Sequence, residues 1–385
     1  MRLLASTLLA AACATARGPA APPPPEEIRF AEPAVVEATP LGVELAGKND
    51  EELFAVGTAA FAAGDFPRAA AAFGRIADLF PASRHHPAAL YDAGLAHQRQ
   101  GEWRLALERF RALERGYLGP DADEASFRVA ECRWHLGELA EARALLDGLA
   151  SREDLEPLDH IRALTWRGVV ELDQGDAEAA ERSLRLALHA WNQRGDRERL
   201  DDYFPAQAQY TLGEVYRSHF QAVRLDPSRD GEETLEKALE LKAELLLSAQ
   251  GHYLRAIRMG NPDWAVAAGY RIGELYDELH AHLTGAAPPP GLDAEAEAAY
   301  RAELARKVRV LVTKAIAVYE RTLDAAQRAR VENVFVERTQ ASLDRMKRAL
   351  SVSGAAAGPE AGGPLPPDAD PSRPPAADGP GRHAP

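Results

Sequence analysis

Small, bulky and turn residues recur in a fixed order along the first half of the chain, beginning at 56–81. Gly57 takes the small position of a first helix, and Gly64-Asp65 makes a turn. The second helix then carries an apolar stripe at helical spacing, formed by Ala69, Phe73 and Ile76. Residues three and four apart share one face of a helix, so this order predicts a helix-turn-helix hairpin. The glycine and alanine leave room for close approach of the two backbones, and the stripe is expected to reach the next hairpin.

The same three features recur along the chain. The small residues that follow Gly57 are spaced 37, 36, 38 and 45 residues apart, at Gly94, Ala130, Gly168 and Gly213. The turn glycines follow in register at Gly101, Gly137 and Gly175, and the stripes repeat as Ala106/Phe110/Leu113, Ala142/Leu146/Leu149 and Ala180/Leu184/Ala187. One such hairpin cannot bury its own apolar face. The recurrence therefore predicts an all-α solenoid of antiparallel hairpins.

These hairpins resemble tetratricopeptide repeats, which implies a right-handed superhelix whose first helices line a concave groove for partner proteins. The repeats occupy 49–195. The register predicts the inward-facing residues Thr58, Phe61, Tyr91, Gln98, Phe127, Trp134, Tyr210 and Arg217. Aromatic residues and arginine are frequent interface anchors, although packing of Phe127 and Trp134 between hairpins is the alternative. The Asn and Lys that grip a peptide carboxylate in some repeats are missing, since Thr58, Leu95, Glu131, Val169 and Glu214 stand there.

The hairpins lengthen over 196–350. Long helices are predicted at 232–259 and 294–323, and a final capping helix at 330–350. The segment from Leu245 to Leu350 resembles a C-terminal block of lipoproteins of delta-proteobacterial type, including those of gliding motility. The residues of this chain that match the block are Asn261-Pro262-Asp263-Trp264, Arg271 to Tyr276, Pro289 to Leu292, Lys314-Ala315, Tyr319-Glu320 and Asn333 to Val336. The segments Leu79 to Ser83 and Ala88 to Gly94 also resemble the repeats of outer-membrane assembly lipoproteins and of a Tol–Pal-associated protein.

The two ends of the chain differ in composition from the repeats. Residues 1–16 form a short apolar export signal, too short for a permanent membrane span. Its end, 9–13, resembles a lipobox in which Cys13 is acylated, although Ala14-Thr15-Ala16 also fits cleavage before Arg17. A Pro/Ala-rich linker, 17–48, follows. The segment 351–385 has almost no large apolar residue and is predicted to be a disordered tail.

The chain has 385 residues and a formal net charge of −14, which disfavours binding to nucleic acid and broad adsorption to anionic membranes. Its two cysteines, Cys13 and Cys132, support neither a disulfide framework nor a zinc site, and Cys132 is predicted to be a small core residue. Gly42 to Lys48 fits a phosphate-binding loop apart from Asn49, and a helix cap at Asn49 or Asp50 is the better explanation. No other catalytic, metal-binding or cofactor motif is found.

These observations predict a protein-interaction scaffold without enzyme activity, cofactor or metal. The expected location is the periplasmic face of the outer membrane, through a lipid on Cys13, with other envelope proteins as partners. A soluble periplasmic adaptor is the alternative. A nucleotide-using enzyme, acting through Gly42 to Lys48, is the alternative from a different class.

Overall fold

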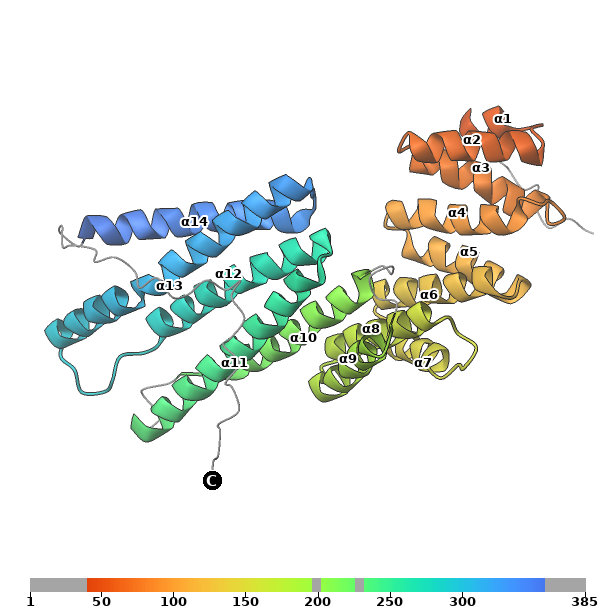
Figure 1. Ribbon diagram of the computed structural model, residues 1–385. Coiled ribbons are helices and arrows are strands. Elements are labelled where there is room, and N and C mark those ends of the chain that lie inside the picture. Colours follow the sequence, from red (N-terminus) through yellow and green to blue (C-terminus); the bar gives the residue numbers. More distant parts are fainter. Residues whose placement is uncertain (1–39, 196–201, 226–231, 357–385) are drawn as a thin grey trace, which may run out of the picture. The chain divides into compact units, whose positions relative to one another are not determined.

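The structure is a computed structural model that describes residues 40–195, 202–225 and 232–356. Every regular element in these three ranges is a helix (Figure 1). The all-α fold of helical hairpins predicted from the sequence is therefore confirmed. The predicted export signal with Cys13 and the chain after residue 356 lie outside the described residues.

The chain divides into two compact units, with the boundary between Lys48 and Asn49. In the first unit the described element is the short helix α1 (Pro40–Leu45), which lies inside the segment predicted as a linker. The helices of the second unit pack in consecutive antiparallel pairs from α2 to α13, with α14 packed on α12 and α13. Their bounds are α2 (Asp50–Ala62), α3 (Phe66–Leu79), α4 (His86–Arg99), α5 (Trp103–Gly116), α6 (Pro120–His135), α7 (Leu139–Ala150), α8 (Pro157–Asp173), α9 (Ala177–Asn192), α10 (Tyr203–Ala222), α11 (Glu232–Met259), α12 (Pro262–Gly285), α13 (Ala294–Ala329) and α14 (Val334–Ala356).

Side-chain caps fix where several helices begin. Asn49 accepts a hydrogen bond from the Glu52 backbone amide at 2.9 Å, while the Glu52 carboxylate accepts one from the Asn49 amide at 3.0 Å. This reciprocal pair satisfies two amides at the start of α2 that have no partner within the helix. Asn261 caps α12 in a similar way, with its side chain accepting from the Trp264 amide at 3.2 Å. The capping role predicted for Asn49 is confirmed.

A glycine in the first helix of a hairpin faces a bulky side chain of the second. A Cβ added to Gly57 would lie 2.6 Å from the Phe73 ring, and one added to Gly94 would lie 2.6 Å from Phe110. The same relation joins Gly168 to Leu184, Gly213 to Tyr253 and Gly273 to Tyr319. The predicted positions of the first-helix glycines are confirmed. The side chain that each glycine makes room for differs from the expectation. Phe73 packs over the glycine of its own hairpin, whereas it was expected to reach toward the next one.

The turns inside the hairpins also depend on glycine. Gly64, Gly101, Gly137 and Gly175 have φ values of +76°, +73°, +76° and +83°. This left-handed conformation costs other residues about 1 kcal/mol or more. The glycine therefore ends the first helix and turns the chain within three residues into the second.

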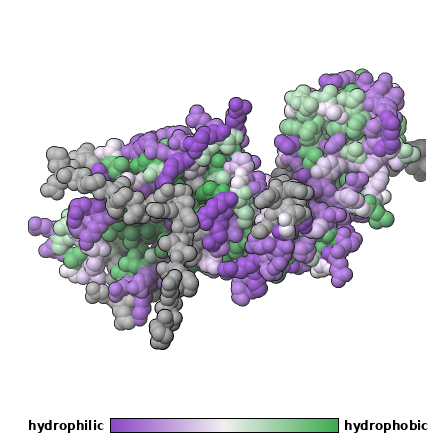
Figure 2. Space-filling view, viewed as in Figure 1, coloured by the Kyte–Doolittle hydropathy of each residue, from purple (hydrophilic) through white to green (hydrophobic). Residues whose placement is uncertain are grey.

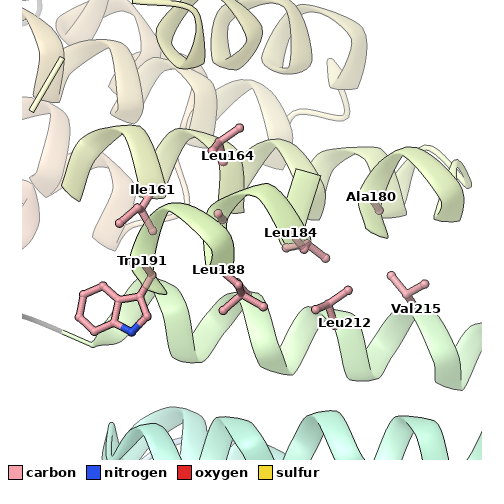
Figure 3. Close-up of a cluster of buried hydrophobic side chains, with 10 residues drawn as sticks. Ile161, Leu164, Ala180, Leu184, Leu188, Trp191, Leu212 and Val215 are labelled. Carbon is pink, nitrogen blue, oxygen red and sulfur yellow. The ribbon is translucent and has the colours of Figure 1, made fainter. Parts of the chain in front are cut away.

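Apolar residues continue from one hairpin to the next in buried clusters that span neighbouring hairpins. Figure 3 shows Ile161 and Leu164 of α8 and Leu188 of α9 close to Leu212 and Val215 of α10, and all five side chains are buried. Neighbouring hairpins thus share a core that none could form alone, as expected for stacked repeats.

The C-terminal half is built from longer helices. The predicted helix at 232–259 is confirmed, whereas α13 extends beyond its predicted end to Ala329. Arg330, predicted to start the last helix, instead ends α13 in a left-handed conformation with φ of 56°, and α14 begins at Val334. Helix α14 then continues through Ala356, six residues into the segment predicted as a tail.

Candidate interaction surface

Three successive first helices, α4, α6 and α8, carry polar side chains that bond across the repeats. The Tyr91 hydroxyl donates to Glu124 at 3.1 Å and accepts from Arg128 Nε at 3.3 Å. Gln98 donates to Glu131 at 3.4 Å, and Arg128 also contacts Glu131 at 3.0 Å. Tyr91 and Gln98 belong to α4 and the other three residues to α6. Two of the predicted groove residues are therefore brought together with partners one repeat further along.

Arg162 extends this network to α8. Its guanidinium bonds to Glu124 and lies 4.0 Å above the centre of the Phe127 ring. The pKa of Glu124 is lowered although burial opposes this, because hydrogen bonds and charge from Arg162, together with the charge of Arg128, favour the ionised carboxylate. Phe127 is only 4% exposed. It was predicted as a groove residue, but it packs between hairpins beneath Arg162 and is not available to a partner.

Aromatic rings gather at the other end of these helices. Trp134 of α6 packs edge-on against Trp166 of α8, with ring centres 5.9 Å apart, and its indole N–H donates to Asp173. Trp103 stacks on His135, with ring centres 3.6 Å apart. Trp134 and Trp166 are each half-buried, so one side of each ring packs on the protein while part remains accessible. We name Tyr91, Gln98, Glu124, Arg128, Glu131, Trp134, Trp166 and Asp173 the first-helix face.

The two predicted residues in the first hairpin lie apart from this network. Thr58 is exposed on α2. Phe61 is half-buried and packs edge-on against Phe66, with ring centres 5.3 Å apart. Neither residue has a polar contact with α4, so α2 does not extend the bonded row.

Tyr210 and Arg217 were predicted to face the groove, but the structure places both inside the C-terminal half. Tyr210 is 8% exposed, accepts a hydrogen bond from Arg271 Nε at 3.1 Å and packs 5.0 Å from the Trp264 ring. Burial raises the pKa of its hydroxyl well above the usual range. Arg217 forms ion pairs with Glu274 at 3.4 Å and with Glu278. Both predictions fail because α12 and α14 cover this side of α10.

Asp92 of α4 differs from the other acidic residues near the first-helix face. Within the described part of the chain, no donor or basic side chain contacts its carboxylate. Burial disfavours the ionised carboxylate, and because no partner offsets this effect, the pKa of Asp92 is raised. A half-buried carboxylate without a protein partner beside Tyr91 is able to accept hydrogen bonds from a bound molecule.

Sequence reasoning did not select Glu124, Arg128, Trp166 or Asp173. A usable signal was present, since the residues that bond across repeats are 33 to 39 positions apart, close to the repeat length. Pairing polar residues at this interval would have found Tyr91 with Glu124 and Gln98 with Glu131. Figure 2 shows that hydrophilic residues cover much of the visible surface over α6 to α9.

Other candidate features have structural explanations. Cys132 is fully buried, and burial raises the pKa of its thiol to about 12, so it is a core residue as predicted. Gly42 to Leu45 are helical in α1, a backbone that does not wrap around a phosphate. Within the described ranges, no three His, Cys, Asp or Glu side chains are grouped to hold a metal ion. Among the described helices, none has the length and apolar character needed to cross a bilayer.

Comparison with known proteins supports the repeat assignment. A family described as tetratricopeptide repeat matches residues 54–97 and 91–157. No curated protein matches the chain. Similar solved structures include a tetratricopeptide repeat protein from Parabacteroides merdae (14% identity, 79% of this chain and 98% of that chain, TM-score 0.37). Others are the apo form of RapI (10% identity, 79% and 96%, TM-score 0.43) and a Rap protein complexed with competence and sporulation factor (13% identity, 79% and 76%, TM-score 0.36). The match to the tetratricopeptide repeat model thus covers the segment 54–157, which contains α4 and α6.

Proposed function

We propose that the chain is a non-enzymatic scaffold that binds partner proteins on the first-helix face. Helical repeats of this kind are typical of protein-interaction scaffolds, because each repeat adds one more helix to a continuous surface. The observation that carries the proposal is the bonded row from Tyr91 through Glu124 and Arg128 to Arg162, with Trp134 fixed by Asp173. Side chains that are already held in place lose little freedom on binding, which favours affinity.

The chemistry of this face indicates what a partner offers. Tyr91 and Trp134 provide half-buried aromatic rings, and large aromatic side chains are the commonest interface anchors. Asp92, which follows Tyr91 on α4 and lies outside the named face, provides a carboxylate without a protein partner among the described residues. A partner segment with an apolar side chain and a nearby N–H or basic group therefore fits.

The binding proposal is tested with the full chain carrying Tyr91→Ala and Trp134→Ala together. Truncating one interface anchor typically costs about 2 kcal/mol, so with both removed the partner recovery in a cross-linked envelope pull-down is expected to fall by at least about 30-fold. Tyr300→Ala on α13 is the matched control, because this half-buried tyrosine lies far along the chain from the first-helix face. Circular dichroism checks that the helices persist. Full recovery by the double variant, with loss on deletion of 357–385 instead, would assign binding to the tail.

We further propose that the chain is anchored by a lipid on Cys13 and organises a multiprotein complex at the periplasmic face of the outer membrane, with envelope assembly or motility as the setting. The support is the short apolar run that ends at Cys13 and the resemblance of Leu245 to Leu350 to envelope lipoproteins. Mass spectrometry of the mature N-terminus tests this. Diacylglyceryl-Cys13 is expected, a terminus at Arg17 indicates a soluble periplasmic adaptor, and an intact Met1 contradicts both.

A further inference from the structure

An open pocket lies between α9, α10 and α11, on residues that the first-helix face does not use. Its volume is about 430 Å³. The lining comes from one face of each helix, at helical spacing: Arg185, Leu188, His189 and Asn192 of α9, Gln209 and Leu212 of α10, and His252 and Arg255 of α11. No acidic residue is in this lining, although the chain as a whole carries a net charge of −14.

The floor of the pocket is apolar and buried. Leu188 and Leu212 are 7% and 1% exposed and belong to the core cluster that joins α8, α9 and α10 (Figure 3). The pocket therefore opens directly onto the shared core. Such a floor accepts a branched apolar group, because burying it removes apolar surface from water.

The basic residues at the rim are not equivalent. Arg185 Nε contacts Glu181 at 2.8 Å, and the Tyr216 hydroxyl donates to the same carboxylate at 2.8 Å. Glu181 thus compensates the charge of Arg185. Arg255 has no such partner, since no carboxylate in the described part of the chain lies within ion-pair distance of it.

A hydrogen bond to Gln209 orients the side chain of Arg255. Its Nε donates to Gln209 Oε1 at 3.3 Å, and His252 Nδ1 lies 3.0 Å from the same oxygen. This amide oxygen is an acceptor, so His252 carries its proton on Nδ1 and donates it. Burial lowers the pKa of His252 to about 4, helped by the nearby charges of Arg255 and Arg185, and the ring is neutral at pH 7. Both Nη groups of Arg255 have no acceptor among the described residues.

We propose that this pocket binds a single carboxylate whose neighbouring carbon carries a branched apolar side chain. The two free Nη groups of Arg255 match the two oxygens of a carboxylate, a planar pairing that arginine favours. The apolar side chain of the ligand then packs on Leu188 and Leu212. One uncompensated guanidinium in the lining selects one negative charge over the two of a phosphate. Both a peptide C-terminus and a free carboxylic acid supply this chemistry.

The test measures binding of small probes to the full chain by NMR titration. N-acetyl-leucine provides the carboxylate and the apolar side chain, and N-acetyl-leucinamide is the matched probe without the charge. The acid is expected to bind at least about tenfold more tightly than the amide, and inorganic phosphate more weakly than the acid. Equal binding of acid and amide, no measurable binding of the acid, or tighter binding of phosphate would overturn the proposal.

Two variants connect the binding to the pocket. Arg255→Gln is expected to weaken N-acetyl-leucine binding at least about tenfold. Arg182→Gln is the control, because it removes the same charge from α9 at an exposed site outside the lining, where Arg182 pairs with Glu178. Unchanged binding by Arg255→Gln, or an equal loss in both variants, contradicts the assignment.

The source of the carboxylate is then decided with a peptide that ends in leucine. If its free-acid form binds at least tenfold more tightly than N-acetyl-leucine and its amidated form does not, the ligand is a peptide C-terminus. If the peptide gains nothing, the pocket recognises a small carboxylic acid. The pocket lies on α9 to α11, so failure of these tests leaves the proposal for the first-helix face untouched.

Discussion

Close contact between a glycine and a bulky residue holds each of several hairpins together. At Gly168, a single added carbon would lie 2.6 Å from Leu184 and 3.3 Å from the carbonyl oxygen of Ala180. The leucine could adjust its rotamer, but the backbone oxygen belongs to α9 and cannot move alone. Even the smallest substitution would therefore push α8 and α9 apart.

Gly168→Ala is expected to lower the free energy of unfolding by about 1–3 kcal/mol, as overpacking of a core does. The control is Gly148→Ala in α7, where the added carbon meets nothing within 4 Å. There alanine is the better helix former by about 1 kcal/mol, so this variant should be neutral or more stable. Urea unfolding measures both. Equal stability of the two variants would show that the α8–α9 contact is not tight.

His252 gives the chain a pH-dependent stability. Its pKa is about 4 in the folded protein, lowered by burial and by the charges of Arg255 and Arg185, against 6.5 when free. As the pH falls below about 6.5, the unfolded chain takes up a proton that the folded chain does not. The stability from the neutral ring is therefore full above about pH 6.5 and is lost progressively toward pH 4, by up to about 3 kcal/mol.

His252→Gln keeps a donor toward Gln209 but cannot take up the proton. The variant is expected to lose less stability than the wild type between pH 6.5 and pH 4. It is also expected to be less stable by a constant amount at all pH values, because it lacks the stacking of His252 on Tyr216. Urea unfolding at a series of pH values measures the slope. Identical slopes for the two proteins would contradict the role assigned to His252.

At the scale of the element, the second helices begin after the same glycine turn but with different caps. Asp65 and Asp176 cap α3 and α9, accepting from the Arg68 and Ala179 amides at 3.2 and 3.0 Å. Glu138, at the equivalent position before α7, has a similar backbone but makes no side-chain cap. The longer glutamate side chain does not return to the amide two or three residues ahead, and it is less suited to this position than aspartate.

Exchanging the two acids tests this difference. Glu138→Asp is expected to stabilise the chain by about 0.5–1 kcal/mol because it adds a side-chain cap, and Asp176→Glu is expected to destabilise it by a similar amount because it removes one. Neither substitution changes the net charge, so a change in charge does not contribute. Thermal unfolding followed by circular dichroism gives the order. If both variants shift the midpoint in one direction, the cap is not the cause.

Much of the hairpin architecture follows from the sequence, because the small residue, the turn glycine and the apolar stripe recur at regular spacing from Gly57 through Gly168. The face of a helix is also predictable, as Tyr91 and Gln98 demonstrate. What spacing does not reveal is whether a later helix covers that face. Tyr210 stands at the position equivalent to Tyr91, yet it packs beside Trp264 of α12 and Phe335 of α14. The covering helices begin more than fifty residues later, so the local pattern carries no sign of them.

At the scale of the molecule, charged residues join the long helices of the C-terminal half. Arg217 of α10 contacts three carboxylates, those of Glu214, Glu274 and Glu278, and Arg271 of α12 contacts Glu214 in return at 3.0 Å. All five side chains are less than 20% exposed. Two guanidinium groups thus balance most of the charge of three partly buried carboxylates. Removing one guanidinium group leaves partly buried carboxylates without a compensating positive charge, which is destabilising.

Arg217→Met is therefore expected to cost about 2–4 kcal/mol, whereas Arg301→Met on α13 should cost less than about 1 kcal/mol, because the Arg301–Glu297 pair is exposed. In stacked repeats each element is stabilised by its neighbours. The loss should then fall on α10 to α14, and hydrogen exchange should show these helices losing protection while α2 to α7 keep theirs. Uniform loss along the chain would mean that all helices unfold as one cooperative unit, and that the Arg217 network does not stabilise the C-terminal half separately.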